Sequence, residues 1–160
     1  MSLPPLPDTA VVIGAVADDW RAAIRLAGDA LVASGLAAPP YVDAMLAMVE
    51  EHGPYIVISP GLALAHARPD ASVLGDGLAV VTLATPVVFG SAYNDPVRVV
   101  LGLAVLDVGT HLESIGALAN VFNDPSVTSR LAAATSAEEI RAIMGIPADG
   151  SVSPVDGSVS

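Results

Sequence analysis

The segment GPYIVISPGLALAHARP, residues 53–69, combines a strand, a turn and a candidate reactive side chain. Tyr55 to Ser59 is a continuous apolar run, which is typical of a buried strand. Pro60-Gly61 interrupts it, because these two residues together favour a turn. Residues 62–66 then predict another short strand or an extended loop. This segment ends at His66, between small uncharged neighbours, so an imidazole is expected at a surface rim.

The rest of the chain alternates apolar runs with helical patterns. Two more runs bounded by Gly, Pro or Asp predict buried strands that share a sheet with the first, at Leu78 to Leu83 and Arg98 to Asp107. Apolar residues at helical spacing predict helices before and after these strands along the chain. Their expected extents are 20–31, capped by Asp18 or Asp19 and ended by Gly35; 42–52, ended by Gly53; 112–122; one from Asp124-Pro125; and one capped by Ser136 with Glu139.

Length and composition predict one domain with a substantial core, since 53% of the 160 residues are hydrophobic and 14% are charged. We expect the domain to span residues 8–146, after an N-terminal extension of residues 1–7. Residues 147–160 are rich in Ser, Gly, Asp and Pro and repeat DGSVS, which predicts a disordered tail. The absence of cysteine excludes disulfides, thiolate metal sites and cysteine nucleophiles, and is compatible with the cytoplasm.

Charge and motifs exclude several functions. A net charge of −11 with no lysine argues against a nucleic-acid surface. No apolar run approaches the ~20 residues that span a bilayer, and the start of the chain lacks a signal-peptide pattern, so we expect a cytoplasmic protein without membrane insertion. Glycine-rich nucleotide motifs are absent, and the three histidines lack metal-ligand spacing. We therefore expect no metal ion and no cofactor.

A second histidine lies at the start of a predicted helix. Thr110-His111-Leu112-Glu113 fits the Ser/Thr-x-x-Glu capping box directly after the long apolar run, which predicts His111 as the first helical residue. The unpaired amides and positive dipole end of a helix N-terminus favour anions. A phosphoryl group suits such a place.

Phosphoryl transfer requires mainly a positioned nucleophile and donors for the phosphoryl oxygens. A neutral imidazole can attack without a separate base, so we take His66 as the nucleophile and His111, with the helix amides, as its donors. Taken alone, His66 fits a hydrogen-bonded structural histidine better, and His111 fits a tolerated first-turn residue equally well.

The motifs together resemble those of a known family. Residues 53–61 and 62–69 are similar to the phosphohistidine segment of enzyme IIA components of the bacterial sugar phosphotransferase system, in the mannitol/fructose superfamily and nearest its ascorbate-type branch. Supporting segments are 41–46, 94–97 and 101–113. The resemblance covers most of residues 8–146.

This resemblance implies a single three-layer α/β domain, with a central mixed sheet flanked by helices on both faces. It implies a phosphotransferase activity: a phosphocarrier that accepts a phosphoryl group from the histidine-containing phosphocarrier protein and passes it to an enzyme IIB, in uptake of ascorbate or a related pentitol. His66 matches the phosphorylated histidine and His111 the second active-site histidine. Ala65 stands where the family usually has proline, and Met48-Val49-Glu50-Glu51 lacks the arginine of mannitol-type members.

Several further residues complete the predicted site. Arg68 shares the face of His66 if the chain there is extended, so it is a candidate phosphate donor, together with Ser59 and Thr110. Leu62, Leu64, Ala65 and Ala67 are candidates for an apolar rim on which partner proteins dock in turn. Apolar helices with few charges leave room for a homodimer interface. A regulatory binding module of the same fold, in which phosphorylation is only a signal or is lost, remains the alternative.

Overall fold

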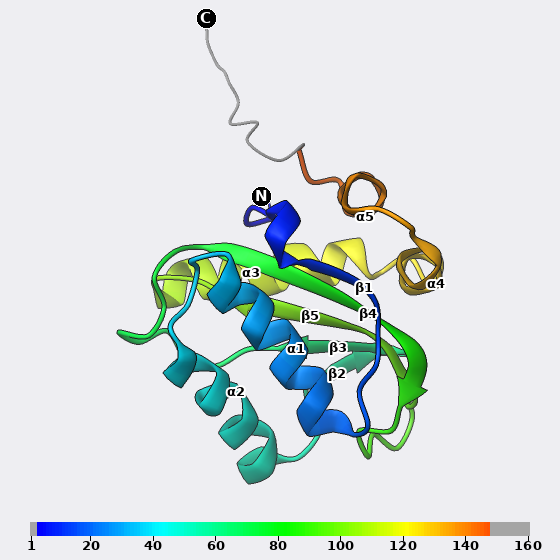
Figure 1. Cartoon of the computed structure of the whole chain (residues 1–160), viewed down its shortest axis with the longest axis horizontal. Coiled ribbons are helices and arrows are strands. Elements are labelled where there is room, and N and C mark those ends of the chain that lie inside the picture. Colours follow the sequence, from blue (N-terminus) through cyan, green and yellow to red (C-terminus); the bar gives the residue numbers. More distant parts are fainter. Residues whose placement is uncertain (1–2, 148–160) are drawn as a thin grey trace, which may run out of the picture.

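Five strands form one mixed sheet at the centre of the molecule, in the order β1-β4-β5-β3-β2 (Figure 1). This is a computed structural model, and it describes residues 3–147. β1 is parallel to β4 and β3 is parallel to β5, whereas the β4–β5 and β2–β3 pairs are antiparallel. The strands are β1 (Val11–Ala15), β2 (Val57–Ser59), β3 (Leu62–Ala65), β4 (Gly77–Val87) and β5 (Val97–Ala104).

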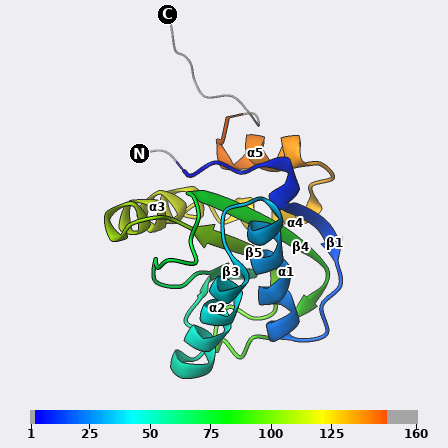
Figure 2. The same cartoon turned by 60° about the vertical axis from the view of Figure 1, so that its left-hand side comes forward.

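Helices cover both faces of this sheet. α1 (Trp20–Ala33) and α2 (Pro39–His52) pack side by side on one face, and α3 (Val108–Val121), α4 (Ser126–Ala133) and α5 (Ala137–Met144) lie on the other (Figures 1 and 2). A short 3-10 helix, η1 (Asp8–Ala10), precedes β1. The predicted α/β architecture with three layers is therefore confirmed. None of the described helices is long and apolar enough to cross a membrane.

The helix ends follow the predicted signals. The Asp19 carboxylate accepts a hydrogen bond from the Ala22 amide at 2.8 Å and starts α1. Gly35 and Gly53 have φ angles of 74° and 83°, a left-handed conformation that suits glycine and ends α1 and α2. Ser136 caps α5 by accepting from the Glu139 amide at 3.1 Å.

The core lies on both faces of the sheet and includes the whole of β3. This strand lies between β2 and β5, so both of its edges are paired and both of its faces are covered. As a result, the residues predicted to form a docking rim are at most 3% exposed, which shows that this prediction was wrong: Leu62, Leu64, Ala65 and Ala67. Their apolar side chains stabilise the fold instead.

The N-terminal segment joins this core. Leu6, inside the predicted extension, is 2% exposed, and its carbonyl oxygen accepts a hydrogen bond from Arg141 Nη1 at 3.0 Å. The same guanidinium contacts the Asp8 carboxylate at 2.7 Å, so α5 is tied to the start of the domain. Residue 8 as a domain boundary stays a prediction, and the predicted tail lies, from residue 148 on, outside the described residues.

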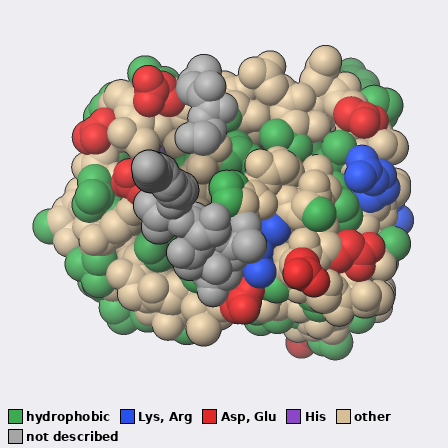
Figure 3. All heavy atoms as spheres, turned by 90° about the horizontal axis from the view of Figure 1, so that it is seen from above, with side chains coloured by type: hydrophobic (Ala, Val, Ile, Leu, Met, Phe, Trp, Pro, Cys, Tyr) green, Lys and Arg blue, Asp and Glu red, His purple; other side chains and the backbone are tan. Residues whose placement is uncertain are grey.

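The face of the molecule that Figure 3 presents carries mainly acidic and uncharged side chains. Figure 3 shows several separate acidic side chains, few basic ones and no histidine in view on the face that it presents.

Candidate functional site

The parallel pairing of β3 and β5 brings two histidines together at one edge of the sheet. His66 directly follows Ala65, the last residue of β3, and α3 follows β5 after a short loop. Parallel neighbours end at the same edge, and in open α/β sheets this carboxyl edge is where ligands bind. The rings of His66 and His111 lie here with their centroids 5.3 Å apart and their planes at 47°. The two predicted catalytic residues are thus adjacent.

The His66 ring has a defined tautomer. Its Nδ1 lies 2.9 Å from the carbonyl oxygen of Leu64. A carbonyl oxygen can only accept a hydrogen bond, so Nδ1 carries the proton and donates it. The lone pair of the neutral ring is therefore on Nε2, which has no hydrogen-bond partner and is not among the buried unpaired atoms of residues 3–147. This nitrogen is free to act as a nucleophile.

Burial keeps the His66 ring neutral. Desolvation lowers the pKa of His66 below its usual value, and the Leu64 carbonyl, which favours the protonated ring, raises it by less. A neutral ring is the form that can attack phosphorus. The environment of His66 therefore favours its nucleophilic state.

Proton binding to His66 should therefore occur at lower pH than in an unfolded chain. In the folded protein we expect a midpoint below the 6.5 of a free histidine, while the urea-unfolded chain should titrate near 6.5. The unfolded chain then binds more protons below pH 6.5, so the His66 contribution to stability is lost as the pH falls through that value. NMR titration of the His66 ring in both states checks this, and a folded-state midpoint at or above 6.5 would contradict it.

The start of α3 differs from the prediction. The N-cap is Asp107 rather than Thr110, because the Asp107 carboxylate accepts a hydrogen bond from the Thr110 amide at 2.7 Å. The helix therefore begins at Val108, one turn earlier, and the His111 amide donates to the Asp107 carbonyl oxygen at 3.0 Å. The Asp107 carboxylate already occupies the Thr110 amide, so this amide is not available to the expected anion site.

The His111 side chain still faces the reactive ring. Its Nδ1 is buried and has no hydrogen-bond partner among residues 3–147. Desolvation lowers the pKa of His111, and the nearby His66 ring lowers it further, because two positive charges would repel. A proton on Nε2 rather than Nδ1 avoids an unpaired buried N–H group. His111 can thus present an N–H donor beside His66.

Sequence reasoning missed an aromatic neighbour of this pair. The Tyr55 ring packs edge-on against His66, with centroids 5.9 Å apart. Tyr55 precedes β2, the antiparallel partner of β3, so the start of β2 and the end of β3 lie at the same edge. The Pro60-Gly61 turn in the sequence was the available signal, since a hairpin places residues at equal distances from its turn opposite each other.

The three predicted phosphate-stabilising residues have different surroundings. Ser59 pairs with Leu62, at the end of β3 that is farther from His66. Four residues of extended chain at ~3.3 Å each separate Leu62 from His66 by about 13 Å, so the prediction that Ser59 stabilises a phosphate on His66 was wrong. Both Thr110 donors, the amide and the hydroxyl, are bonded to Asp107, which leaves none for a phosphate. Arg68 is exposed, and within residues 3–147 its guanidinium makes no hydrogen bond or ion pair.

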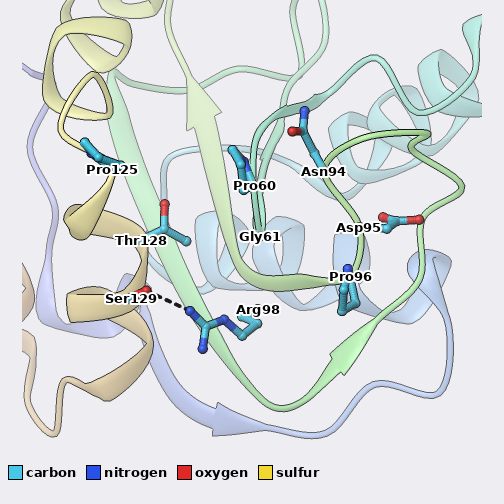
Figure 4. Close-up of a pocket in the computed structure, with 9 residues that line it drawn as sticks. All are labelled: Pro60, Gly61, Asn94, Asp95, Pro96, Arg98, Pro125, Thr128 and Ser129. Atoms are coloured by element: carbon cyan, nitrogen blue, oxygen red, sulfur yellow. Dashed lines mark hydrogen bonds between the residues drawn. The ribbon is translucent and has the colours of Figure 1, made fainter.

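A separate pocket of about 290 Å³ lies at the opposite end of β3, between the Pro60-Gly61 turn that precedes this strand and α4 (Figure 4). Arg98 donates to Ser129 Oγ at 3.0 Å on one side of it. The Asp95 carboxylate points away and accepts hydrogen bonds from the amides of Phe89, Gly90 and Ser91. None of the predicted site residues lines this pocket, so it is distinct from the histidine pair.

Metal binding finds no support in the described part of the chain. Residues 3–147 contain no group of three or more His, Cys, Asp or Glu side chains arranged to hold a metal ion.

Comparison with known proteins gives one consistent family. Residues 5–145 match the model of the phosphoenolpyruvate-dependent sugar phosphotransferase system, EIIA 2. The ascorbate-specific PTS system EIIA component of Shigella boydii is 40% identical over 127 residues, covering 79% of this chain and 82% of the relative.

Two solved structures share the fold. The complex of enzyme IIAMTL and phosphorylated enzyme IIBMTL from Escherichia coli matches with a TM-score of 0.77 and 30% identity, covering 88% of this chain and 96% of the other. The nitrogen regulatory protein IIA-Ntr from Neisseria meningitidis matches with a TM-score of 0.72 and 26% identity, covering 87% of this chain and 95% of the other.

Proposed function

Since the chain belongs to the EIIA 2 family of the phosphoenolpyruvate-dependent sugar phosphotransferase system and is a phosphocarrier that passes a phosphoryl group to an enzyme IIB, we propose that Nε2 of His66 carries that group. The observation that carries this proposal is the hydrogen bond from Nδ1 to the Leu64 carbonyl oxygen, which leaves the lone pair on Nε2. The proposed donor is the histidine-containing phosphocarrier protein.

In the proposed reaction, the Nε2 lone pair attacks the phosphorus of a phosphohistidine on the donor. A new N–P bond forms on His66, and the donor's N–P bond breaks with its electron pair returning to the donor imidazole. Positive charge develops on the His66 ring, and the Leu64 carbonyl stabilises it through the proton on Nδ1. The phosphoryl group then passes from Nε2 to the acceptor side chain of enzyme IIB, and His66 recovers its lone pair.

His111 is proposed to stabilise the transferred group. Its ring lies beside His66, where an N–H donor can bond to a phosphoryl oxygen. A phosphoryl group on the neutral His66 ring places negative charge beside His111, and a nearby anion raises the pKa of an imidazole. Arg68 is a further candidate donor, because it is exposed and lies two residues after His66.

Partner proteins are proposed to dock on exposed apolar side chains around the two histidines rather than on β3. Tyr55 contacts His66 and is 44% exposed. Three more side chains flank His111 at the start of α3 and are at least 56% exposed: Leu106, Val108 and Leu112. A small apolar surface suits a carrier that releases one partner before it binds the next.

We propose ascorbate or a related pentitol as the transported substrate of the whole system, on the basis of the likeness to ascorbate-specific EIIA components. An isolated EIIA contacts proteins and a phosphoryl group, so the substrate is inferred from relatives only. A cytoplasmic location and a homodimer stay predictions from the sequence. Since the fold is also similar to a nitrogen regulatory IIA-Ntr, a regulatory role is the second candidate.

A chase assay tests the carrier role and separates it from the regulatory one. The chain is incubated with ³²P-labelled phosphocarrier protein, re-isolated, and mixed with an ascorbate-type enzyme IIB. A carrier accepts the label and loses it to the enzyme IIB. Label that stays on the chain supports the regulatory candidate, and a chain that never becomes labelled contradicts the carrier role.

A further inference from the structure

We propose that Tyr41 is a positioning residue for His66, which acts by fixing the backbone on the C-terminal side of the reactive ring. This inference rests on the proposed function of His66. Tyr41 lies in the first turns of α2, is 1% exposed, and directs its hydroxyl at the chain beyond β3. It makes no direct contact with the reacting atoms.

The Tyr41 hydroxyl joins three backbone groups at the carboxyl edge of the sheet. It accepts a hydrogen bond from the Ala67 amide at 3.1 Å. Its single proton has two acceptors within reach, the Leu103 carbonyl oxygen at 2.7 Å and the Ala67 carbonyl oxygen at 3.2 Å, of which the first is nearer. One side chain of α2 thus ties the residue after His66 to the end of β5.

These bonds persist over the working pH range. Burial raises the pKa of Tyr41 to about 12, with a smaller opposing effect from its hydrogen bond to Ala67, so the hydroxyl keeps its proton. A protonated hydroxyl donates and accepts at the same time, as this arrangement requires.

The Tyr41 hydroxyl fixes the backbone that follows His66, which has fewer hydrogen bonds than the backbone that precedes it. On the N-terminal side, β3 is bonded to β5 as far as Ala65. On the other side, Ala67 belongs to no strand, and within residues 3–147 its amide has Tyr41 as its acceptor. Ala67 is 3% exposed, so water cannot easily replace a lost bond. Without the hydroxyl, the backbone at Ala67 would shift and carry His66 with it.

Replacing Tyr41 with phenylalanine removes the hydroxyl and keeps the ring that fills the core. We expect Tyr41→Phe to lower the maximal rate of phosphoryl acceptance about tenfold, because small displacements of reacting groups cost up to ~100-fold in rate. The KM for the phosphocarrier protein should stay unchanged, since no docking side chain is altered. The NMR signals of the unphosphorylated His66 ring should shift, and the Ala67 amide should exchange with solvent faster than in the wild type.

Thr82→Val is the matched control. Thr82 is 2% exposed, and its hydroxyl likewise accepts a backbone bond, from the Gly14 amide at 2.9 Å, but it lies on β4 near the β1 edge of the sheet. The Thr82→Val variant should lower the unfolding temperature as Tyr41→Phe does, but it should leave the transfer rate and the His66 ring signals unchanged. If both variants slow phosphoryl acceptance equally, the effect of Tyr41→Phe is a loss of general stability and Tyr41 does not position His66.

The inference is overturned if folded Tyr41→Phe shows wild-type His66 ring signals, or if the Ala67 amide of the wild type exchanges as fast as the exposed Arg68 amide. Both measurements use the unphosphorylated protein. They therefore remain decisive even if the wild type accepts no phosphoryl group, an outcome that would contradict the proposed function instead.

Discussion

The His66→Ala variant is expected to accept no phosphoryl group from the phosphorylated phosphocarrier protein. The substitution removes the Nε2 lone pair, and within residues 3–147 no other ring at the sheet edge donates one nitrogen to a backbone carbonyl and leaves the second nitrogen free. We expect the rate of labelling to fall at least ~1,000-fold, as for the loss of a nucleophile in other covalent mechanisms. The measurement is acid-labile, base-stable ³²P on the re-isolated chain.

His52→Ala supplies the control for this loss. His52 is the last residue of α2, and its ring contacts the Glu51 carboxylate and the ring of Tyr55, so one side chain separates it from His66. It should be labelled at a rate within about twofold of the wild type, as expected for a residue outside the reacting group. Label retained on His66→Ala, or lost on His52→Ala, would move the nucleophile to another histidine.

The second large effect is expected from His111→Ala. This variant keeps the nucleophile and removes the proposed N–H donor beside it, so it should still become labelled, but about 100-fold more slowly. The loss should appear in the maximal rate rather than in the KM for the phosphocarrier protein, because the donor acts on the developing charge. Rapid-quench measurement of the first turnover gives both parameters.

His111→Gln tests whether donation is the reason. The glutamine amide offers an N–H group but cannot become positively charged, so we expect it to recover part of the rate that alanine loses. A rate for His111→Ala equal to that of the wild type would remove His111 from the mechanism. Equal rates for the alanine and glutamine variants would remove hydrogen-bond donation as its role.

The main architecture could be predicted because its signals are local. The apolar runs, the turn at Pro60-Gly61 and the helix-ending Gly35 and Gly53 depend on short stretches of sequence, and the structure confirms each of them. The prediction that His66 and His111 act together rested on the family resemblance and on the position of each histidine after a predicted strand. In the structure their adjacency follows from the parallel pairing of β3 and β5.

The wrong predictions have physical reasons that only the three-dimensional structure reveals. Leu62 and Leu64 come directly after the Pro60-Gly61 turn, which suggested a position near the surface, yet the pairing of β3 on both edges buries them. Thr110 fits a capping box, but Asp107, three residues earlier, provides a carboxylate that accepts a hydrogen bond from the amide of Thr110 itself and so starts the helix one turn sooner. Ser59 is near His66 in sequence and distant in space, because the hairpin turn separates them along the length of β3.

The role of Tyr41 could not be predicted from the sequence either. Tyr41 lies just before the predicted helix of residues 42–52, and nothing in its neighbourhood in the sequence connects it with Ala67 or Leu103. The contact arises from how α2 packs on the carboxyl edge of the sheet. A role that depends on such packing becomes visible only in the folded chain.

The central claim is that the phosphoryl group is carried on Nε2 of His66. Heteronuclear NMR of the ¹⁵N-labelled wild-type chain, phosphorylated by the phosphocarrier protein, tests it directly, because coupling to phosphorus identifies the bonded ring nitrogen. We predict ³¹P coupling to His66 Nε2, with the proton on Nδ1 still bonded to the Leu64 carbonyl oxygen. Phosphorus on Nδ1 of His66, or on the ring of His111 or His52, would contradict the account.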